Sequence, residues 1–201
     1  QNYEDTILMF RLGDFYEMFF DDAKTASKEL ELVLTGRDCG QEERAPMCGV
    51  PFHSADGYIA KLVSKGYKVA MCEQMEDPAA AKGIVRRDVI RVITPGTVIE
   101  SSMLDESKNN YLASVCATNG NVGMCFIDIS TGEVNLTEFN ENVEQRVINE
   151  MGRYNPTEII LNKEVVSFNS LKDFISKKLE ASVELLIEEF EFSNAELLCK
   201  E

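Results

Sequence analysis

Apolar residues fall into short runs along the first hundred positions, separated by polar turns. Residues 7–12 and 15–19 are runs of strand length, and Gly13-Asp14 between them marks a turn. Apolar side chains recur at helical spacing over 20–31, with two aspartates in the first turn, where the helix dipole favours acidic groups. The same reasoning predicts strands at 30–35, 67–74 and 89–94, a helix at 54–65 and a loop over 36–49.

The second half of the chain begins with a meander of strands. Apolar runs flank Thr118-Asn119-Gly120, a strong hairpin signal, and Ser130-Thr131-Gly132 marks a turn before the run 133–139. Three meandering strands followed by alternating helices and strands match the order of an RNase H-like sheet, which is an association with a known fold. The later elements are expected as helix 141–152, strand 157–161, helix 168–179, strand 182–187 and a last helix opened by Ser193 and Glu196.

The polar segment 100–110 separates these halves, and we place a domain boundary within it. The predicted fold class is α/β: a mixed-sheet α/β domain over 1–105, followed by an RNase H-like α/β domain over 106–201. The sequence does not start with Met and stops inside a predicted helix. We therefore expect a piece of a longer chain, with the second domain continuing past Glu201.

Composition narrows the classes of function. The fractions of hydrophobic (44%) and charged (27%) residues are typical of globular proteins, and no apolar run is long enough to span a membrane. The net charge of −15 is shared by both halves, whereas DNA-binding surfaces are usually basic. A self-sufficient DNA-binding module is therefore disfavoured, but a fragment whose parent carries the basic charges elsewhere stays open. The six cysteines fit no zinc spacing, so we expect reduced thiols and no metal site.

The stretch Phe15-Tyr16-Glu17 raises the question of what a carboxylate does beside aromatic residues. On a strand, Phe15 and Glu17 share one face and Tyr16 points to the other. If that face is buried, Glu17 is costly unless it is paired. If the face is exposed, Phe15 is a solvent-facing aromatic that could enter a DNA base step, with a carboxylate beside it to bond a base. The residues alone leave both interpretations open.

Signs of catalysis are weak. No P-loop or G-x-G-x-x-G motif occurs, so no nucleotide site is predicted. Asp128 ends a strand where an RNase H-like nuclease would place an aspartate, but the carboxylates that would complete a two-metal site are not evident in the following strands. We expect this chain not to be an enzyme and to hold no cofactor, and keep a metal-dependent nuclease as an alternative.

Four sequence blocks together carry a specific resemblance. They read FRLGDFYEMFFDDAK, APMCGVPFHS, LVSKGYKVAMCEQMEDP and VIRVITPGTV, in that order. Over residues 5–105 they closely resemble the N-terminal mismatch-recognition domain of the MutS family of bacterial DNA mismatch repair proteins. Residues 106–201 are similar, with weaker motifs, to the start and middle of that family's connector domain.

The resemblance implies roles for particular residues. Phe15 matches the phenylalanine that inserts from the minor groove and stacks on a mispaired base, and Glu17 matches the glutamate that bonds that base. Tyr16, Phe19 and Phe20 are expected to pack behind this wedge. Softer DNA-binding candidates, placed where the family's domain approaches the duplex backbone or minor groove, are Asp14, Arg37, Met47 and Arg87.

The resemblance also implies partners. These are mismatched double-stranded DNA, a MutL-type repair protein docking on the connector, and a second copy of the parent in a homodimer, with no membrane. ATP and Mg are expected only in ATPase domains that lie outside this chain, to which the connector would relay. The expected localisation is cytoplasmic, bacterial and nucleoid-associated. The alternative is a protein-interaction fragment that does not bind DNA independently.

Overall fold

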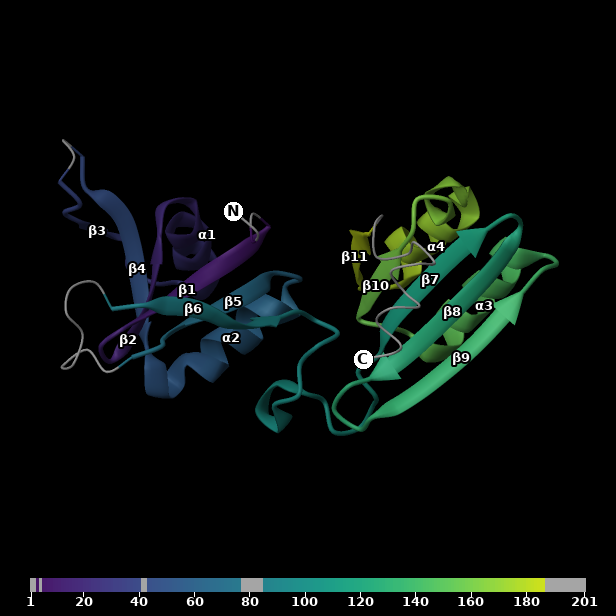
Figure 1. Ribbon diagram of the computed structural model, residues 1–201, viewed down its shortest axis with the longest axis horizontal. Coiled ribbons are helices and arrows are strands. Elements are labelled where there is room, and N and C mark those ends of the chain that lie inside the picture. Colours follow the sequence, from purple (N-terminus) through teal and green to yellow (C-terminus); the bar gives the residue numbers. More distant parts are fainter. Residues whose placement is uncertain (1–2, 4, 41–42, 77–84, 187–201) are drawn as a thin grey trace. The chain divides into compact units, whose positions relative to one another are not determined.

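The chain forms two compact units, Gln1–Thr94 (unit 1) and Pro95–Glu201 (unit 2), each built on its own sheet (Figure 1). The structure, a computed structural model, describes residues 3, 5–40, 43–76 and 85–186. Within those residues, no helix is both long and apolar enough to cross a membrane. The predicted α/β class is confirmed, because helices alternate with mixed sheets in both units.

Unit 1 is organised around a six-stranded sheet in the order β3-β4-β2-β1-β5-β6. The β1–β5 pair is parallel and the other neighbouring pairs are antiparallel. The strands are β1 (Thr6–Leu12), β2 (Phe15–Phe19), β3 (Thr35–Arg37), β4 (Ala45–Pro51), β5 (Lys68–Gln74) and β6 (Arg87–Ile93).

Two helices cover one face of this sheet. Helix α1 (Phe20–Leu30) contacts β2 and β4, α2 (Ala55–Ser64) contacts β4 and β5, and the two helices contact each other. Their apolar stripes bury Ala23, Ala26, Ile59 and Leu62 against the sheet. The side chains on the opposite face of β2 therefore lie outside this helix-covered core.

Two predictions for the region between the helices are wrong. The strand expected at 30–35 is absent, since α1 runs to Leu30 and the strand β3 begins only at Thr35. The loop expected over 36–49 contains most of β4, a central strand of the sheet. Its sequence, APMCGVP, is rich in proline and glycine, which are uncommon in strand interiors, so its pattern did not indicate a strand.

Unit 2 contains a five-stranded sheet in the order β11-β10-β7-β8-β9. Strands β7, β8 and β9 form an antiparallel meander, and β10 and β11 extend it in parallel from β7. This is the predicted RNase H-like order. The elements are β7 (Leu112–Thr118), β8 (Asn121–Asp128), β9 (Glu133–Phe139), α3 (Val143–Tyr154), β10 (Glu158–Leu161), α4 (Asn169–Lys178) and β11 (Ser182–Leu185). The helix expected around Ser193 and Glu196 lies outside the described residues.

Helices α3 and α4 cover one face of the second sheet (Figure 1). The core between these helices and the sheet contains Phe126, Val147, Met151, Ile159 and Leu171, each at most 1% exposed. The ring of Phe126 stacks on Tyr154, with the ring centroids 4.1 Å apart. Unit 2 therefore has a hydrophobic core of its own.

Unit 2 begins at Pro95, two residues after β6 ends. The Gly96 amide donates a hydrogen bond of 2.8 Å to Glu158 Oε2, at a buried position. The carbonyl of Pro95 accepts hydrogen bonds from Asn110 Nδ2 and Thr157 Oγ1. The contacts thus place residues from Pro95 onwards with unit 2, ahead of the polar segment at 100–110.

Candidate nucleic-acid interface

A tight hairpin places Phe15 at the end of the first sheet. Strands β1 and β2 are joined by two residues, Gly13 and Asp14, with Leu12 paired opposite Phe15. The backbone angle φ of Gly13 is +60°, a conformation that glycine adopts without steric cost. Phe15 follows this turn directly and its side chain is 47% exposed. A large aromatic ring is therefore held in solvent by a short, fixed connection.

The faces of β2 are divided as the sequence predicts. Tyr16 and Met18 are buried, at 7% and 0% exposure, on the face that the helices cover. Phe15, Glu17 and Phe19 alternate with them and lie on the other face. The prediction that Phe15 and Glu17 share a face is confirmed.

Glu17 is partly buried and forms an ion pair. Its side chain is 19% exposed, and its Oε2 lies 2.5 Å from Nη1 of Arg37. Arg37 comes from β3, at the edge of the sheet, and its guanidinium carbon lies 5.9 Å from the centre of the Phe19 ring. The pairing partner that the buried interpretation required is thus supplied by a residue twenty positions along the chain.

A glycine lies opposite Glu17 on the neighbouring strand. Gly49 is the cross-strand partner of Glu17 on β4. A Cβ atom at Gly49 would lie 3.4 Å from Cγ of Glu17 and 3.2 Å from the carbonyl oxygen of Tyr16. The distance to Glu17 is an ordinary van der Waals contact, whereas the distance to the Tyr16 carbonyl is tight, so a side chain at position 49 would crowd the backbone of β2 beside Glu17.

A second group of polar contacts holds the hairpin in place. The hydroxyl of Tyr16 donates a hydrogen bond to Glu73 on β5. Arg11 Nε donates to the carbonyl of Gly13 at 2.6 Å, and its guanidinium lies 3.5 Å from the centre of the Phe52 ring. Burial and the bond to Glu73 raise the pKa of Tyr16 to about 12. Sequence analysis missed Arg11, Glu73 and Gly49, because pairing across strands leaves no local signal.

The softer candidates occupy different positions. Asp14 is exposed in the turn beside Phe15, and its carbonyl accepts a hydrogen bond from the Phe52 amide. Met47 is half-buried on β4, paired with Phe19. Arg87 begins β6, and its Nε donates to the carbonyl of Arg11 at 3.4 Å, close to the hairpin. The structure therefore brings Glu17, Arg37 and Met47 together around Phe19, while their contact with DNA stays a prediction.

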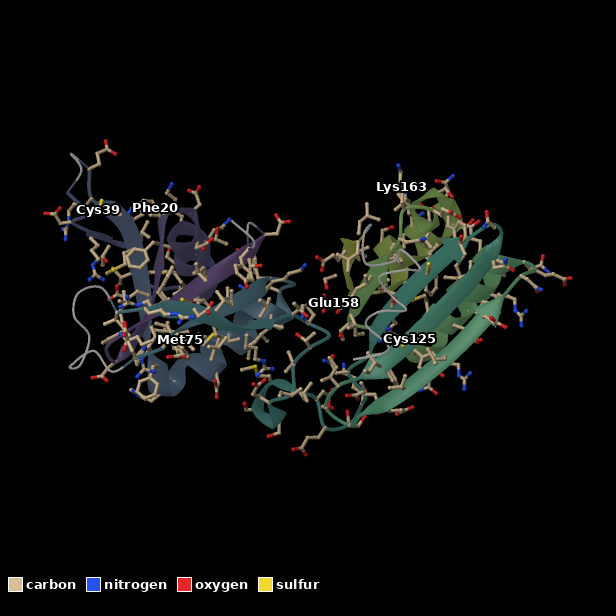
Figure 2. The ribbon with its side chains drawn as sticks, in the orientation of Figure 1. Phe20, Cys39, Met75, Cys125, Glu158 and Lys163 are labelled. Carbon is tan, nitrogen blue, oxygen red and sulfur yellow. The ribbon has the colours of Figure 1, made fainter. Side chains whose placement is uncertain are left out.

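Phe20 does not pack behind the wedge as expected. Its side chain is 60% exposed, and it lies at the surface of unit 1 (Figure 2). Its φ of 54 is unusual for a bulky residue and marks the sharp change from strand β2 to helix α1. Phe19 does pack, edge to face with Phe10, and Tyr16 is buried as predicted.

Replacing Tyr16 with phenylalanine should destabilise unit 1 by about 1–2 kcal/mol, because Glu73 loses a hydrogen-bond donor at a half-buried position. Urea denaturation of the 201-residue chain measures this loss. Tyr58→Phe on α2 is the control, and we expect it to change stability by less than about 0.5 kcal/mol. Equal stability of the two variants would show that the Tyr16–Glu73 bond does not support the hairpin.

Asp128, the residue behind the nuclease alternative, has a structural role in unit 2. Its side chain is 1% exposed, and its Oδ1 accepts hydrogen bonds from the amide and hydroxyl of Ser130 and from the Thr131 amide. Its Oδ2 accepts the Asn110 amide at 3.1 Å. Burial opposes ionisation, but these bonds outweigh it and lower the pKa of Asp128. The carboxylate thus fixes the β8–β9 turn and the residues preceding β7.

Asp128→Asn should destabilise unit 2 by about 2 kcal/mol near neutral pH, because either orientation of the amide places an N–H group against an N–H donor. The lowered pKa of Asp128 means that its stabilisation is complete above the ordinary aspartate pKa of about 3.9 and is lost as the pH falls through the lower, folded-state value. Urea midpoints measured across this pH range should therefore converge for the two proteins in acid. A constant difference would contradict this account.

Comparison with known proteins assigns both units to one class of multidomain protein. Residues 1–102 match the family model described as MutS domain I, and residues 110–200 match that described as MutS domain II. The chain therefore belongs to the MutS family.

Curated relatives carry the same family name. The DNA mismatch repair protein MutS of Ruminiclostridium cellulolyticum is 56% identical over 197 residues, covering 97% of this chain and 23% of the relative. That of Acetivibrio thermocellus is 54% identical over 191 residues, covering 94% and 22%. The protein of the same name from Clostridioides difficile is 64% identical over 160 residues, covering 80% and 17%. The chain thus spans less than a quarter of the length of these relatives.

Proposed function

We propose that this chain is the mismatch-sensing and connector part of a DNA mismatch repair protein. In this proposal Phe15 inserts from the minor groove and stacks on a mispaired base, and Glu17 hydrogen-bonds that base. The observation that carries the proposal is the exposure of Phe15, at 47%, on the same face as Glu17 and directly after a two-residue turn. Membership of the MutS family supports the choice of mismatched DNA as the ligand.

Discrimination by such a wedge is mostly indirect. Inserting an apolar side chain between bases unstacks a step and kinks the duplex, at a cost of a few kcal/mol. The cost is smaller at a mispair, which is already poorly stacked, so the protein tests how easily a step deforms. The hairpin suits this task because contacts from Arg11 and Tyr16 hold it from behind.

The negative net charge of the chain implies that other parts of the parent protein make most of the contacts with the DNA backbone. Affinity for DNA depends mainly on neutralised phosphates, and this chain has a net charge of −15. We propose that other parts of the parent protein encircle the duplex, form the homodimer and hydrolyse ATP with Mg, and that unit 2 relays to them and docks a MutL-type partner. Isolated, the chain would bind DNA weakly.

We also propose that the chain contributes no catalytic group. The hydrogen bonds that Asp128 accepts support this, because they commit both carboxylate oxygens to the fold. A soluble, cytoplasmic parent acting at the bacterial nucleoid is consistent with these roles.

The test of the proposed function uses the full-length protein that contains this chain. Its affinities for a G·T-mismatched and a matched duplex are compared at one fixed salt concentration, with Phe15 intact and with Phe15→Ala. A mismatch preference that disappears with the ring supports the proposal. A preference that survives in a stably folded variant contradicts it.

A further inference from the structure

The carboxylate proposed to bond a mispaired base already has a partner in the structure. Glu17 Oε2 lies 2.5 Å from Arg37 Nη1. We propose, as an inference that rests on the proposed function, that this ion pair acts as a latch. The pair stays formed (closed) on matched DNA and breaks (opens) when Glu17 hydrogen-bonds a mispaired base. Arg37 would then be a specificity-determining residue that acts through Glu17, in addition to any attraction of its charge to the DNA backbone.

The geometry shows that the closed state is a built arrangement. Arg37 is paired with Ala45, whereas Glu17 is paired with Gly49, so the arginine side chain must run along the sheet to reach the carboxylate. It does so beside Phe19, whose ring centre lies 5.9 Å from the guanidinium carbon. Gly49 lies opposite Glu17, and a Cβ there would lie 3.2 Å from the carbonyl oxygen of Tyr16, so the glycine permits the close approach of β4 to β2 at this point. The Glu17 carboxylate is thus paired with a residue of the edge strand β3, whose guanidinium lies beside Phe19.

The latch is also weak enough to open. The side chain of Arg37 is 50% exposed and that of Glu17 is 19% exposed, so water screens their attraction. Pairs of this kind contribute at most about a fivefold factor in an equilibrium constant. A hydrogen bond between the carboxylate and a mispaired base can offset that cost. In an intact Watson–Crick pair the ring N–H groups are occupied by the partner base and the base stays stacked in the duplex, so we expect the latch to stay closed.

This mechanism predicts coupling between positions 37 and 17 on one kind of DNA only. On a matched duplex the pair is present before and after binding, so its strength cancels from the affinity. On a mismatched duplex the wild-type protein must break the pair, and a variant without Arg37 does not. The ion pair therefore reduces the preference for mismatched over matched DNA, and removing it should increase that preference.

The experiment is a double-mutant cycle in the full-length protein, with Arg37→Met, Glu17→Gln and the double variant. Affinities are measured for a G·T-mismatched and a matched duplex at one fixed salt concentration. On matched DNA, Arg37→Met should weaken binding by the same factor whether Glu17 is intact or replaced. On mismatched DNA, Arg37→Met should weaken binding by a smaller factor in the protein with Glu17 than in the protein with Glu17→Gln. We expect these two factors to differ by about two- to fivefold.

Two further variants separate the latch from a general effect of charge. Arg44→Met removes a charge from an exposed residue on the same β3–β4 connection, and its effect should not depend on residue 17. Arg37→Lys keeps a cation that can pair with Glu17, so it should restore most of the wild-type coupling. Both results are expected if Arg37 acts through Glu17.

Other outcomes would overturn the inference. Additive effects on both duplexes would show that the pair is not broken on recognition, and equal coupling on both would show that it opens on any DNA. Phe15→Ala is measured in parallel. If it abolishes mismatch preference while the cycle is additive, only the latch is wrong. If mismatch preference survives without Phe15, the proposed function itself is wrong and the latch is withdrawn with it.

Discussion

Phe15→Ala should abolish most of the preference of the full-length protein for mismatched DNA. Stacking of an aromatic side chain on a base contributes about 1–3 kcal/mol, which corresponds to roughly a 5- to 150-fold loss of affinity for the mismatched duplex. Affinity for matched DNA should change little, because it depends on phosphate contacts made elsewhere. The fold should be retained, since the ring is 47% exposed and lies outside the core. Equilibrium binding to G·T-mismatched and matched duplexes at one salt concentration measures both effects.

Phe20→Ala is the matched control for this prediction. Phe20 is the first residue of α1, directly after the other end of β2, and is more exposed than Phe15, at 60%. If exposed aromatic surface in unit 1 were enough, the two substitutions would weaken mismatch binding alike. We expect Phe20→Ala to leave the mismatch preference intact. If both variants lost a similar part of the mismatch preference, the position of Phe15 after the Gly13-Asp14 turn would not be the cause of that preference.

Local sequence patterns were sufficient for part of this site. The apolar runs around Gly13-Asp14 predicted the β1–β2 hairpin, and the two-residue period of a strand placed Phe15 and Glu17 on one face. They could not predict the Glu17–Arg37 pair. Arg37 lies beyond α1, on a strand that pairs with β4, and β4 itself was expected to be a loop. Because neither β3 nor β4 was predicted at its observed position, the site that they form with β2 could not be assembled from the sequence.

The second unit shows a similar division between local and long-range information. Its meander was predictable because Asn119-Gly120 and Thr131-Gly132 mark both turns, and the observed sheet has the predicted order. The role of Asp128 was not predictable. Its position at the end of a strand suggested a metal ligand, but its hydrogen bonds to Ser130 and Asn110 make it a turn residue. Only the three-dimensional structure shows which backbone amides converge on a carboxylate.

Gly96 illustrates a residue whose importance depends on packing rather than on a turn. It follows β6 and is buried against the second sheet, with its amide bonded to Glu158 Oε2 at 2.8 Å (Glu158 is labelled in Figure 2). A Cβ atom here would lie 2.9 Å from Cβ of Glu158 and 3.0 Å from Cβ of Leu112. These are positions on β10 and β7, two paired strands whose backbones cannot easily move apart.

We therefore expect Gly96→Val to destabilise unit 2 by about 3 kcal/mol. Overpacking a tight site costs about 1–3 kcal/mol, and displacing the Gly96 amide weakens a buried hydrogen bond worth about as much again. Urea denaturation of the 201-residue chain gives the loss, and hydrogen exchange in β7 and β10 assigns it to unit 2. Gly123→Val is the control, because a Cβ at this position on β8 meets nothing within 4 Å. If the two variants unfolded at the same urea concentration, the close packing of Gly96 against Glu158 and Leu112 would not be a source of stability.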